Sequence, residues 1–176
     1  MNAQDFSRQW RKSPLGRFAL STPAAGGLSE SSAAALREYG LPVTAEPWLR
    51  FMEFLRTDDK TAAALKQLGY YPIGILPNGD IICIDKSSDR VMICDHEDLS
   101  YTWILNSSLE SLYECLMLFD TFIAEVNRKN PRFASDFKIP DGLLKDFEAR
   151  LTSCDAQAMA LKGFWFTEIQ ALDDNV

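Results

Sequence analysis

The sequence predicts an α+β fold, in which a single domain holds a mostly antiparallel β-sheet covered on one face by α-helices. Three observations support this class. Short segments rich in β-branched and aromatic residues follow one another through the middle of the chain, turn residues separate them, and helical segments come after them. The chain of 176 residues is within the usual size of one domain. The pattern does not alternate strand and helix, which argues against a parallel nucleotide-binding sheet.

The first 28 residues are predicted to be a lead-in segment, flexible in part, that precedes one domain over residues 29–176. The second half of this lead-in is rich in Ser, Ala, Gly and Pro, which form few regular contacts. The first helix is predicted over Ser31–Tyr39, with Ser29 as its N-cap and Gly40 at its end.

Two short elements are predicted next. Residues 48–55 hold several large apolar side chains without a clean period, and we predict a strand there. Asp58 or Asp59 is predicted to cap a helix over residues 60–68, which is rich in Ala and Leu and ends at Gly69.

The middle of the chain predicts a β-hairpin sheet most clearly. Strands are predicted at residues 70–76, 81–85 and 90–95, and Pro77-Asn78-Gly79-Asp80 has the chemistry of a turn. If Asp85 lies opposite Arg90, the period of two places the aliphatic side chains of the last two strands on one face, which we expect to be the core face. These aliphatic residues are Ile82, Ile84, Val91 and Ile93. The opposite face then carries Ile81, Cys83, Asp85, Arg90, Met92 and Cys94.

A further strand and three helices complete the prediction. The strand covers residues 101–105, and Ser107 followed by Glu110 indicates a capping box for a long apolar-striped helix that ends near Val126. This helix is expected to lie across the core face of the hairpin. A second helix is predicted over residues 141–153 with Asp141 as its cap, and a terminal helix over residues 164–172.

The charge balance limits the classes of partner. There are 25 acidic and 18 basic residues, which gives a net charge of −7. A chain of this charge does not bind nucleic acid or anionic lipid through general electrostatic attraction, so we expect neither as a partner. No apolar run approaches the roughly 18 residues of a membrane span. A basic protein partner is compatible with the charge.

The expected location is the cytoplasm. The basic residues between Arg8 and Arg17 are not followed by an unbroken apolar stretch, so we predict no export signal. The four cysteines are then expected to be reduced thiols, and none belongs to a C-x-x-C pair.

No arrangement of residues indicates catalysis, a metal or a cofactor. Cys83, Cys94 and His96 offer three ligand types, but structural zinc sites use four ligands in closely spaced pairs. Cys94 or Cys115 as a nucleophile lacks an accompanying orienting motif. We therefore predict a non-enzymatic binding protein without a cofactor.

One polar feature stands out as a candidate binding surface. Between residues 80 and 98, acidic residues outnumber basic ones, and tyrosines lie nearby in the sequence. Polar hairpin turns explain this pattern in structural terms, whereas the functional interpretation is an acidic rim that attracts a basic partner, with the tyrosines as anchors. The candidate residues are Asp80, Asp85, Asp89, Asp95, Glu97, Asp98, Tyr70, Tyr71 and Tyr101.

The order of the central motifs carries a family resemblance. Gly40-Leu41-Pro42 precedes a strand with Ile73-Gly74, then Ile81-Ile82-Cys83-Ile84-Asp85, then Val91, and finally Ile104-Leu105-Asn106-Ser107-Ser108-Leu109 at the start of the long helix. This order resembles the SUKH superfamily (the Smi/Knr-like fold), in its bacterial toxin-immunity branch. The resemblance covers about residues 36–126.

The sequence departs from this family pattern at one position. The family often has Gly in the turn before the strand that holds Val91, and this chain has Asp89 there. Aspartate adopts positive φ more readily than most residues, so the turn is expected to be preserved.

The resemblance implies a protein that acts by binding. Members of that branch neutralise cognate bacterial toxins, often nucleases or deaminases, inside the cell. The implied partner is thus a protein toxin, expected to be basic, which the immunity protein occludes. A scaffold or regulatory protein-interaction domain of the same superfamily is the alternative.

Overall fold

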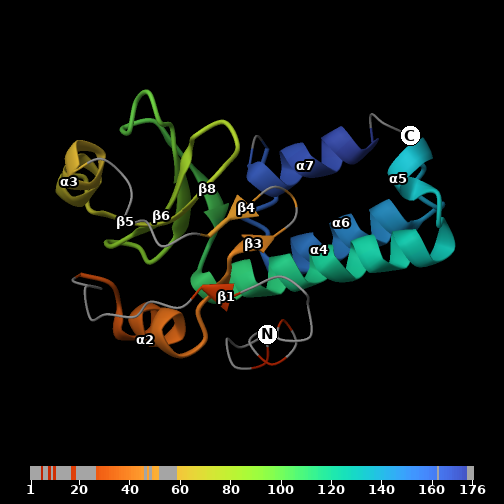
Figure 1. The fold of residues 1–176 in the computed structure, drawn as a ribbon, viewed down its shortest axis with the longest axis horizontal. Helices are drawn as coiled ribbons and strands as arrows, with labels where there is room; N and C mark the ends of the chain where they lie inside the picture. Colours follow the sequence, from red (N-terminus) through yellow and green to blue (C-terminus); the bar gives the residue numbers. More distant parts are fainter. Residues whose placement is uncertain are drawn as a thin grey trace.

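The structure is a computed structural model that describes residues 5, 8, 10, 17–18, 27–45, 47, 49–51, 59–161 and 163–173. Its main feature is a six-stranded sheet in the order β3-β4-β5-β6-β7-β8, in which every neighbouring pair is antiparallel (Figure 1). The strands are β3 Thr44–Ala45, β4 Leu49–Arg50, β5 Tyr70–Ile75, β6 Ile81–Asp85, β7 Val91–Cys94 and β8 Thr102–Asn106. Two shorter strands, β1 Arg17–Phe18 and β2 Leu41–Pro42, pair separately. The predicted α+β class with an antiparallel sheet is confirmed.

The predicted hairpin register is confirmed. Ile82 lies opposite Ile93 and Ile84 opposite Val91, and all four side chains are buried in the main core. The turn at residues 77–80 closes as predicted, since the Leu76 N–H donates to the Asp80 carbonyl at 2.8 Å. The alternation of aliphatic and other residues therefore determines which face of the sheet is inside.

The described helices are α2 Glu30–Glu38, α3 Asp59–Gln67, α4 Leu109–Lys129, α5 Phe133–Asp136, α6 Leu143–Cys154 and α7 Phe164–Asp173. All of them except α3 contribute side chains to the main core or pack against it. The long helix α4 contributes most of the apolar stripe, and α6 lies along it (Figure 1). Phe119 and Phe122 of α4 pack on Phe147 of α6, with ring centroids 5.6 and 4.4 Å from that of Phe147.

A helix also covers part of the second face of the sheet, whereas the sequence predicted helices on one face only. Leu65 of α3 packs with Ile81, Cys83 and Cys94 in a small separate cluster. These three sheet residues belong to the face that was not assigned to the core. Tyr70 and Leu99 pack against the same cluster, so the cover on this face comes from α3 together with these two residues.

The start of α4 corrects the predicted capping box. The N-cap is Ser108 rather than Ser107, and its box partner is Ser111 rather than Glu110: the Ser111 N–H donates to the Ser108 Oγ at 3.1 Å, and the Ser108 N–H donates to the Ser111 Oγ at 3.1 Å. The Ser107 N–H instead donates to the Asp155 carboxylate at 2.7 Å. Because the Ser107 N–H bonds to a carboxylate that is distant in the sequence, α4 begins one residue later than predicted.

Two other cap predictions have different outcomes. Ser29 caps α2 as predicted, because its Oγ accepts from the Ser32 N–H at 3.1 Å. The prediction of Asp141 as the cap of α6 is wrong: Gly142 is the N-cap, with φ of 81°, and no side chain bonds the first turn. The predicted strand over residues 48–55 is represented by Leu49–Arg50, while residues 52–58, including the candidate cap Asp58, lie outside the described residues.

Candidate partner-binding surface

The predicted acidic rim divides between two opposite ends of the sheet. Asp80 precedes β6 and Asp85 ends it, so four residue steps of extended chain, about 13 Å, separate the two ends. Asp95, Glu97, Asp98 and Tyr101 follow β7 and lie at the Asp80 end. At the Asp85 end lie Asp89, in the β6–β7 loop, together with Tyr70 and Tyr71, which pair with Asp85 and Ile84. The rim is therefore not one continuous surface.

The carboxylates at the Asp85 end hold the fold together. Asp85 accepts hydrogen bonds from the hydroxyl groups of Ser87 and Ser88 within its own loop, at 2.9 and 2.6 Å. Asp89 accepts from the hydroxyl groups of Ser29 and Ser32 at 2.8 and 2.9 Å, which ties α2 to the hairpin. These bonds engage both oxygens of Asp85 and the Oδ2 of Asp89, while the Oδ1 of Asp89 is buried without a hydrogen-bond partner among the described residues.

The backbone at Asp89 also confirms one expectation. Its φ is 59°, the left-handed conformation that the family's glycine would adopt. Tyr70 and Tyr71 are half-buried against the two core clusters, so neither is an exposed anchor.

Asp80 is a buried partner of His96 rather than a surface charge. Its exposure is 5%, and its Oδ1 lies 2.8 Å from the His96 Nδ1, while the Asn78 side-chain amide donates to Oδ2 at 2.6 Å. Burial alone would raise the pKa of Asp80, but the hydrogen bonds from His96 and Asn78 outweigh it and lower that pKa. The same hydrogen bond raises the pKa of His96. This pair anchors the β7–β8 connection to the β5–β6 turn.

The segment from Asp95 to Tyr101, which we call the acidic loop, remains as the exposed part of the rim. Asp95 Oδ1 accepts from the N–H groups of Glu97 and Asp98 at 2.7 and 3.0 Å, and Asp98 Oδ1 accepts from the N–H and hydroxyl of Ser100 at 3.0 and 2.6 Å. These bonds shape the loop locally, and Ser100 lowers the pKa of Asp98. Glu97 and Asp98 are exposed, and the loop contains no Lys or Arg.

Aromatic residues adjoin the acidic loop. Tyr101 is 65% exposed, the most exposed of the three candidate tyrosines. Its ring centroid lies 5.8 Å from that of Trp103, which the sequence reasoning did not select. The alternation of residues along β8 places Tyr101 and Trp103 on one face, and this spacing of two was the available signal. Exposed aromatic residues beside charges are typical of interface centres.

Two potential metal sites have different geometries. Within the described part of the chain, the ligand atoms of Asp80, Asp95 and His96 lie within 4.8 Å of one another. Both oxygens of Asp80 and Oδ1 of Asp95 already accept hydrogen bonds from protein groups, so their arrangement is explained without an ion. Cys83 and Cys94, in contrast, are buried in the small cluster with Leu65 and Ile81 and do not belong to this group of ligand atoms.

The four cysteines form two thiol pairs. All four are free, and the Cys115 and Cys154 sulfur atoms lie 3.7 Å apart between α4 and α6. The hydrogen bond with Cys154 and burial raise the pKa of Cys115, and the hydrogen bond with Cys94 and burial raise that of Cys83. The same hydrogen bonds lower the pKa of the partner thiols, Cys154 and Cys94. Cys83, Cys94 and Cys115 are buried, so their sulfur atoms are not open to a substrate.

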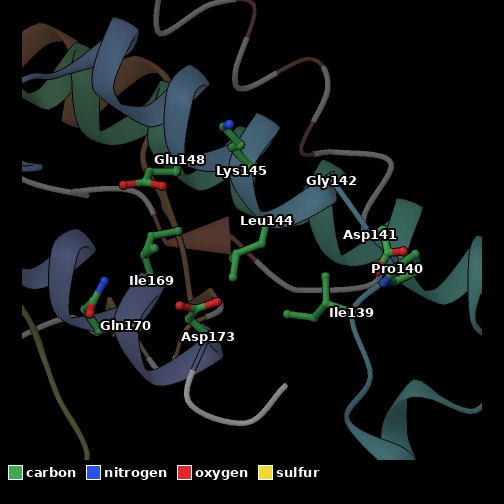
Figure 2. A pocket seen from close by; sticks show the side chains of 10 residues that line it. All are labelled: Ile139, Pro140, Asp141, Gly142, Leu144, Lys145, Glu148, Ile169, Gln170 and Asp173. Atoms are coloured by element: carbon green, nitrogen blue, oxygen red, sulfur yellow. The ribbon is translucent and has the colours of Figure 1, made fainter.

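A pocket lies between α6 and α7. It has a volume of about 390 Å³, and Figure 2 shows Ile169 between the carboxylates of Glu148 and Asp173, with Leu144 beside them. The ten residues that line it include no Ser, Cys or His. Its titratable side chains are therefore the carboxylates of Asp141, Glu148 and Asp173 and the amine of Lys145.

The structure brings an exposed acidic loop together with aromatic residues, an arrangement that is typical of protein interfaces. Comparison with known families agrees. A model of the SUKH-4 immunity protein family matches residues 3–170, and the chain belongs to this family. The match extends the range of residues 36–126 in both directions, across the basic residues 8–17 and the helices α6 and α7.

No curated protein and no solved structure matches the chain. Within the residues that the structure describes, no helix has the length and apolar character needed to cross a membrane. Membership in the immunity family supports a role in which the chain binds a cognate toxin.

Proposed function

We propose that this protein neutralises a basic cognate toxin, of the nuclease or deaminase type, in the cytoplasm by placing its acidic loop over the toxin's substrate-binding groove. Membership in the SUKH-4 immunity protein family supports the immunity role. The observation that carries the site is the acidic loop, where Asp95, Glu97 and Asp98 are not balanced by any Lys or Arg between residues 95 and 101.

The physical basis is electrostatic complementarity. An enzyme that binds nucleic acid needs a basic groove, because phosphate contacts supply most of its affinity. The acidic loop offers such a groove carboxylates in place of phosphates, and Tyr101 beside them offers an aromatic surface. Charge of this kind mainly raises the association rate and fixes the orientation of the partner. No catalytic step is needed, because an occupied groove excludes substrate.

The test uses a catalytically inactive form of the toxin domain that the immunity role predicts to be encoded next to this gene. We expect binding with a Kd below about 1 μM that weakens as salt is raised, because exposed charges are screened. Charge reversal by Glu97→Lys together with Asp98→Lys is expected to slow association by about tenfold or more. Asp95 is left unchanged because its carboxylate holds the loop backbone.

The matched control reverses two carboxylates elsewhere. Glu148→Lys together with Asp173→Lys makes the same change in net charge at the pocket between α6 and α7 (Figure 2). The proposal requires that this control slow association much less than the loop variant. If the control has the larger effect, the interface lies at α6 and α7 instead. If the wild-type chain and the neighbouring toxin do not associate at low salt, the proposed function is wrong.

A further inference from the structure

The strand β8 is an edge of the sheet with unusual composition. It is the last strand in the order, and among the described residues no strand pairs with its outer side. Its five residues, Thr102–Asn106, include no Lys, Arg or Pro. Soluble proteins usually protect edges with such residues or with very short strands, because an open edge pairs readily with another chain.

The opposite edge of the same sheet shows the usual protection. That edge is β3, which has two residues, Thr44–Ala45, with Pro42 and Pro47 close to it in the chain. The two edges of this sheet therefore differ. The chain blocks the β3 edge by length and proline, whereas β8 is longer and uncharged, and its regular register with β7 runs from Thr102 to Ile104 before it shifts between Val91 and Met92.

The direction of the backbone groups on β8 follows from one hydrogen bond. The Asp95 N–H donates to the Tyr101 carbonyl at 3.0 Å, so the backbone of Tyr101 faces the preceding strand. Backbone groups alternate along an antiparallel strand. Trp103, opposite Ile93, then also faces β7, while the N–H and C=O groups of Thr102 and Ile104 point away from β7 to the outer side.

Only one end of β8 is held by a helix. The Trp165 indole of α7 donates to the Asn106 Oδ1 at 3.1 Å, and α7 then leads away from the sheet (Figure 1). Asn106 and Leu105 are buried, whereas Thr102, Trp103 and Ile104 are half-buried. The other end adjoins the acidic loop and the exposed Tyr101. The accessible edge therefore begins where the negative charge is concentrated.

We propose that the outer edge of β8 receives an extended basic segment of the toxin as an additional strand of the sheet. This proposal rests on the proposed function and specifies how the partner binds. Main-chain hydrogen bonds to Thr102 and Ile104 supply affinity that does not depend on side chains, and Tyr101 and Trp103 supply contacts on one face. The acidic loop selects a segment with Lys or Arg next to the paired residues.

Charge decides between this occupant and a second copy of the chain. Each copy carries a net charge of −7, and β8 itself has no charged residue to offset the repulsion between two copies. A basic segment, in contrast, gains attraction from Glu97 and Asp98 at the same time as it pairs with the edge. The complementary occupant is thus the basic one.

The experiment compares Ile104→Pro with Ile104→Ala in the full chain. Proline removes the outward N–H donor and places a ring at the edge, while alanine keeps the donor and removes a similar part of the side chain. With the inactive toxin domain encoded by the neighbouring gene as the probe, we expect Ile104→Pro to raise the Kd by about tenfold or more relative to Ile104→Ala. Circular dichroism and thermal unfolding verify that both variants fold.

Hydrogen exchange on the unmodified chain provides a measurement that does not depend on the proline variant. The amides of Thr102 and Ile104 are expected to exchange about tenfold or more slowly in the complex than in the free chain, because they gain carbonyl partners. If the complex forms while these amides are unaffected and Ile104→Pro binds like Ile104→Ala, the strand-addition proposal is wrong and the proposed function stands.

Two other outcomes would overturn the strand-addition proposal. If the wild-type chain does not bind the toxin, both proposals fail together. If light scattering shows that the free wild-type chain is a dimer and that Ile104→Pro is a monomer, the edge pairs with a second copy, and the proposal of a basic occupant is overturned.

Discussion

Asp155 provides the sharpest test of how this fold is held together, because its buried carboxylate joins three elements without a basic partner. Its exposure is 4%. Oδ2 accepts from the Asn106 side-chain amide, the Ser107 N–H and the Ser111 hydroxyl at 3.1, 2.7 and 2.7 Å, and Oδ1 accepts from the Ala158 N–H at 3.1 Å. The end of β8, the start of α4 and the end of α6 therefore share one acceptor.

Replacing this residue leaves several donors unpaired. Hydrogen bonds to a charged group contribute about 1.5–3 kcal/mol each, and they are not additive when they share one acceptor. We expect Asp155→Ala to lower the free energy of unfolding by about 3–5 kcal/mol, which for a chain of this length lowers Tm by about 6–20 °C. Asp155→Asn keeps the volume and one acceptor, and should lose about half as much.

Urea unfolding followed by Trp fluorescence measures these changes, since Trp165 is fully buried and bonded to Asn106. The control is Glu148→Ala, an exposed carboxylate on the same helix, which should change stability by less than about 0.5 kcal/mol. The reasoning is refuted if Asp155→Ala loses less than about 1 kcal/mol at an unchanged m-value.

The pH dependence gives a second check on the same residue. Burial alone would raise the pKa of Asp155, but its hydrogen bonds outweigh burial and lower that pKa below the ordinary 3.8. A lowered folded pKa stabilises the fold above pH 3.8, and this stabilisation is lost as the pH falls through the folded value. The difference in stability between wild type and Asp155→Asn should therefore narrow in acid.

Three further predictions concern other groups. Burial raises the pKa of Glu168 from 4.5 to about 7, so ionisation of this carboxyl destabilises the fold as pH rises through this range. Glu168→Gln should therefore raise the free energy of unfolding at pH 8 by about 1–2 kcal/mol, with solvent screening allowed for, and should leave it unchanged at pH 4. Equal Tm values for the variant and the wild type at pH 8 would contradict this prediction. The hydrogen bond to Asp80 raises the pKa of His96 above 6.5 in the folded state. Protonation of His96 therefore stabilises the fold fully below pH 6.5, and this contribution is lost as pH rises through the folded-state pKa. Thermal unfolding should show the loss in the wild type and not in His96→Gln. Asp89 has φ of 59°, a conformation that glycine adopts without strain and alanine does not. Asp89→Gly should therefore have a free energy of unfolding about 1 kcal/mol higher than that of Asp89→Ala, although both variants lose the carboxylate. Equal urea midpoints for the two variants would argue against strain at this position.

The sheet was predictable from local patterns. The pairing of Ile82 with Ile93 and of Ile84 with Val91 follows from a period of two, because a slip by one residue would expose every aliphatic side chain on the core face. The cap at Ser29 was predictable for a similar reason, since a hydroxyl three residues before an unpaired N–H satisfies it locally.

The candidate site was less predictable. Acidic residues between positions 80 and 98 are close together in the chain, which suggested one rim, but the strands carry them to opposite ends of the sheet. Asp80 turns inward to His96, and Asp89 bonds to two serines about 60 residues earlier in the chain. Sequence proximity does not reveal such partners. The acidic loop keeps its exposure because its carboxylates bond within the loop itself.

The amino-acid sequence alone determined the α+β class, the hairpin register and the resemblance to the SUKH superfamily, since all three depend on residues that are neighbours in the chain or lie across one tight turn. The tertiary structure alone decided where α4 begins and which carboxylates remain available to a partner. The physical reason is the same in both cases: a hydrogen bond stabilises a buried or half-buried polar group, and for the Ser107 N–H and the Asp89 Oδ2 the partner comes from a distant segment.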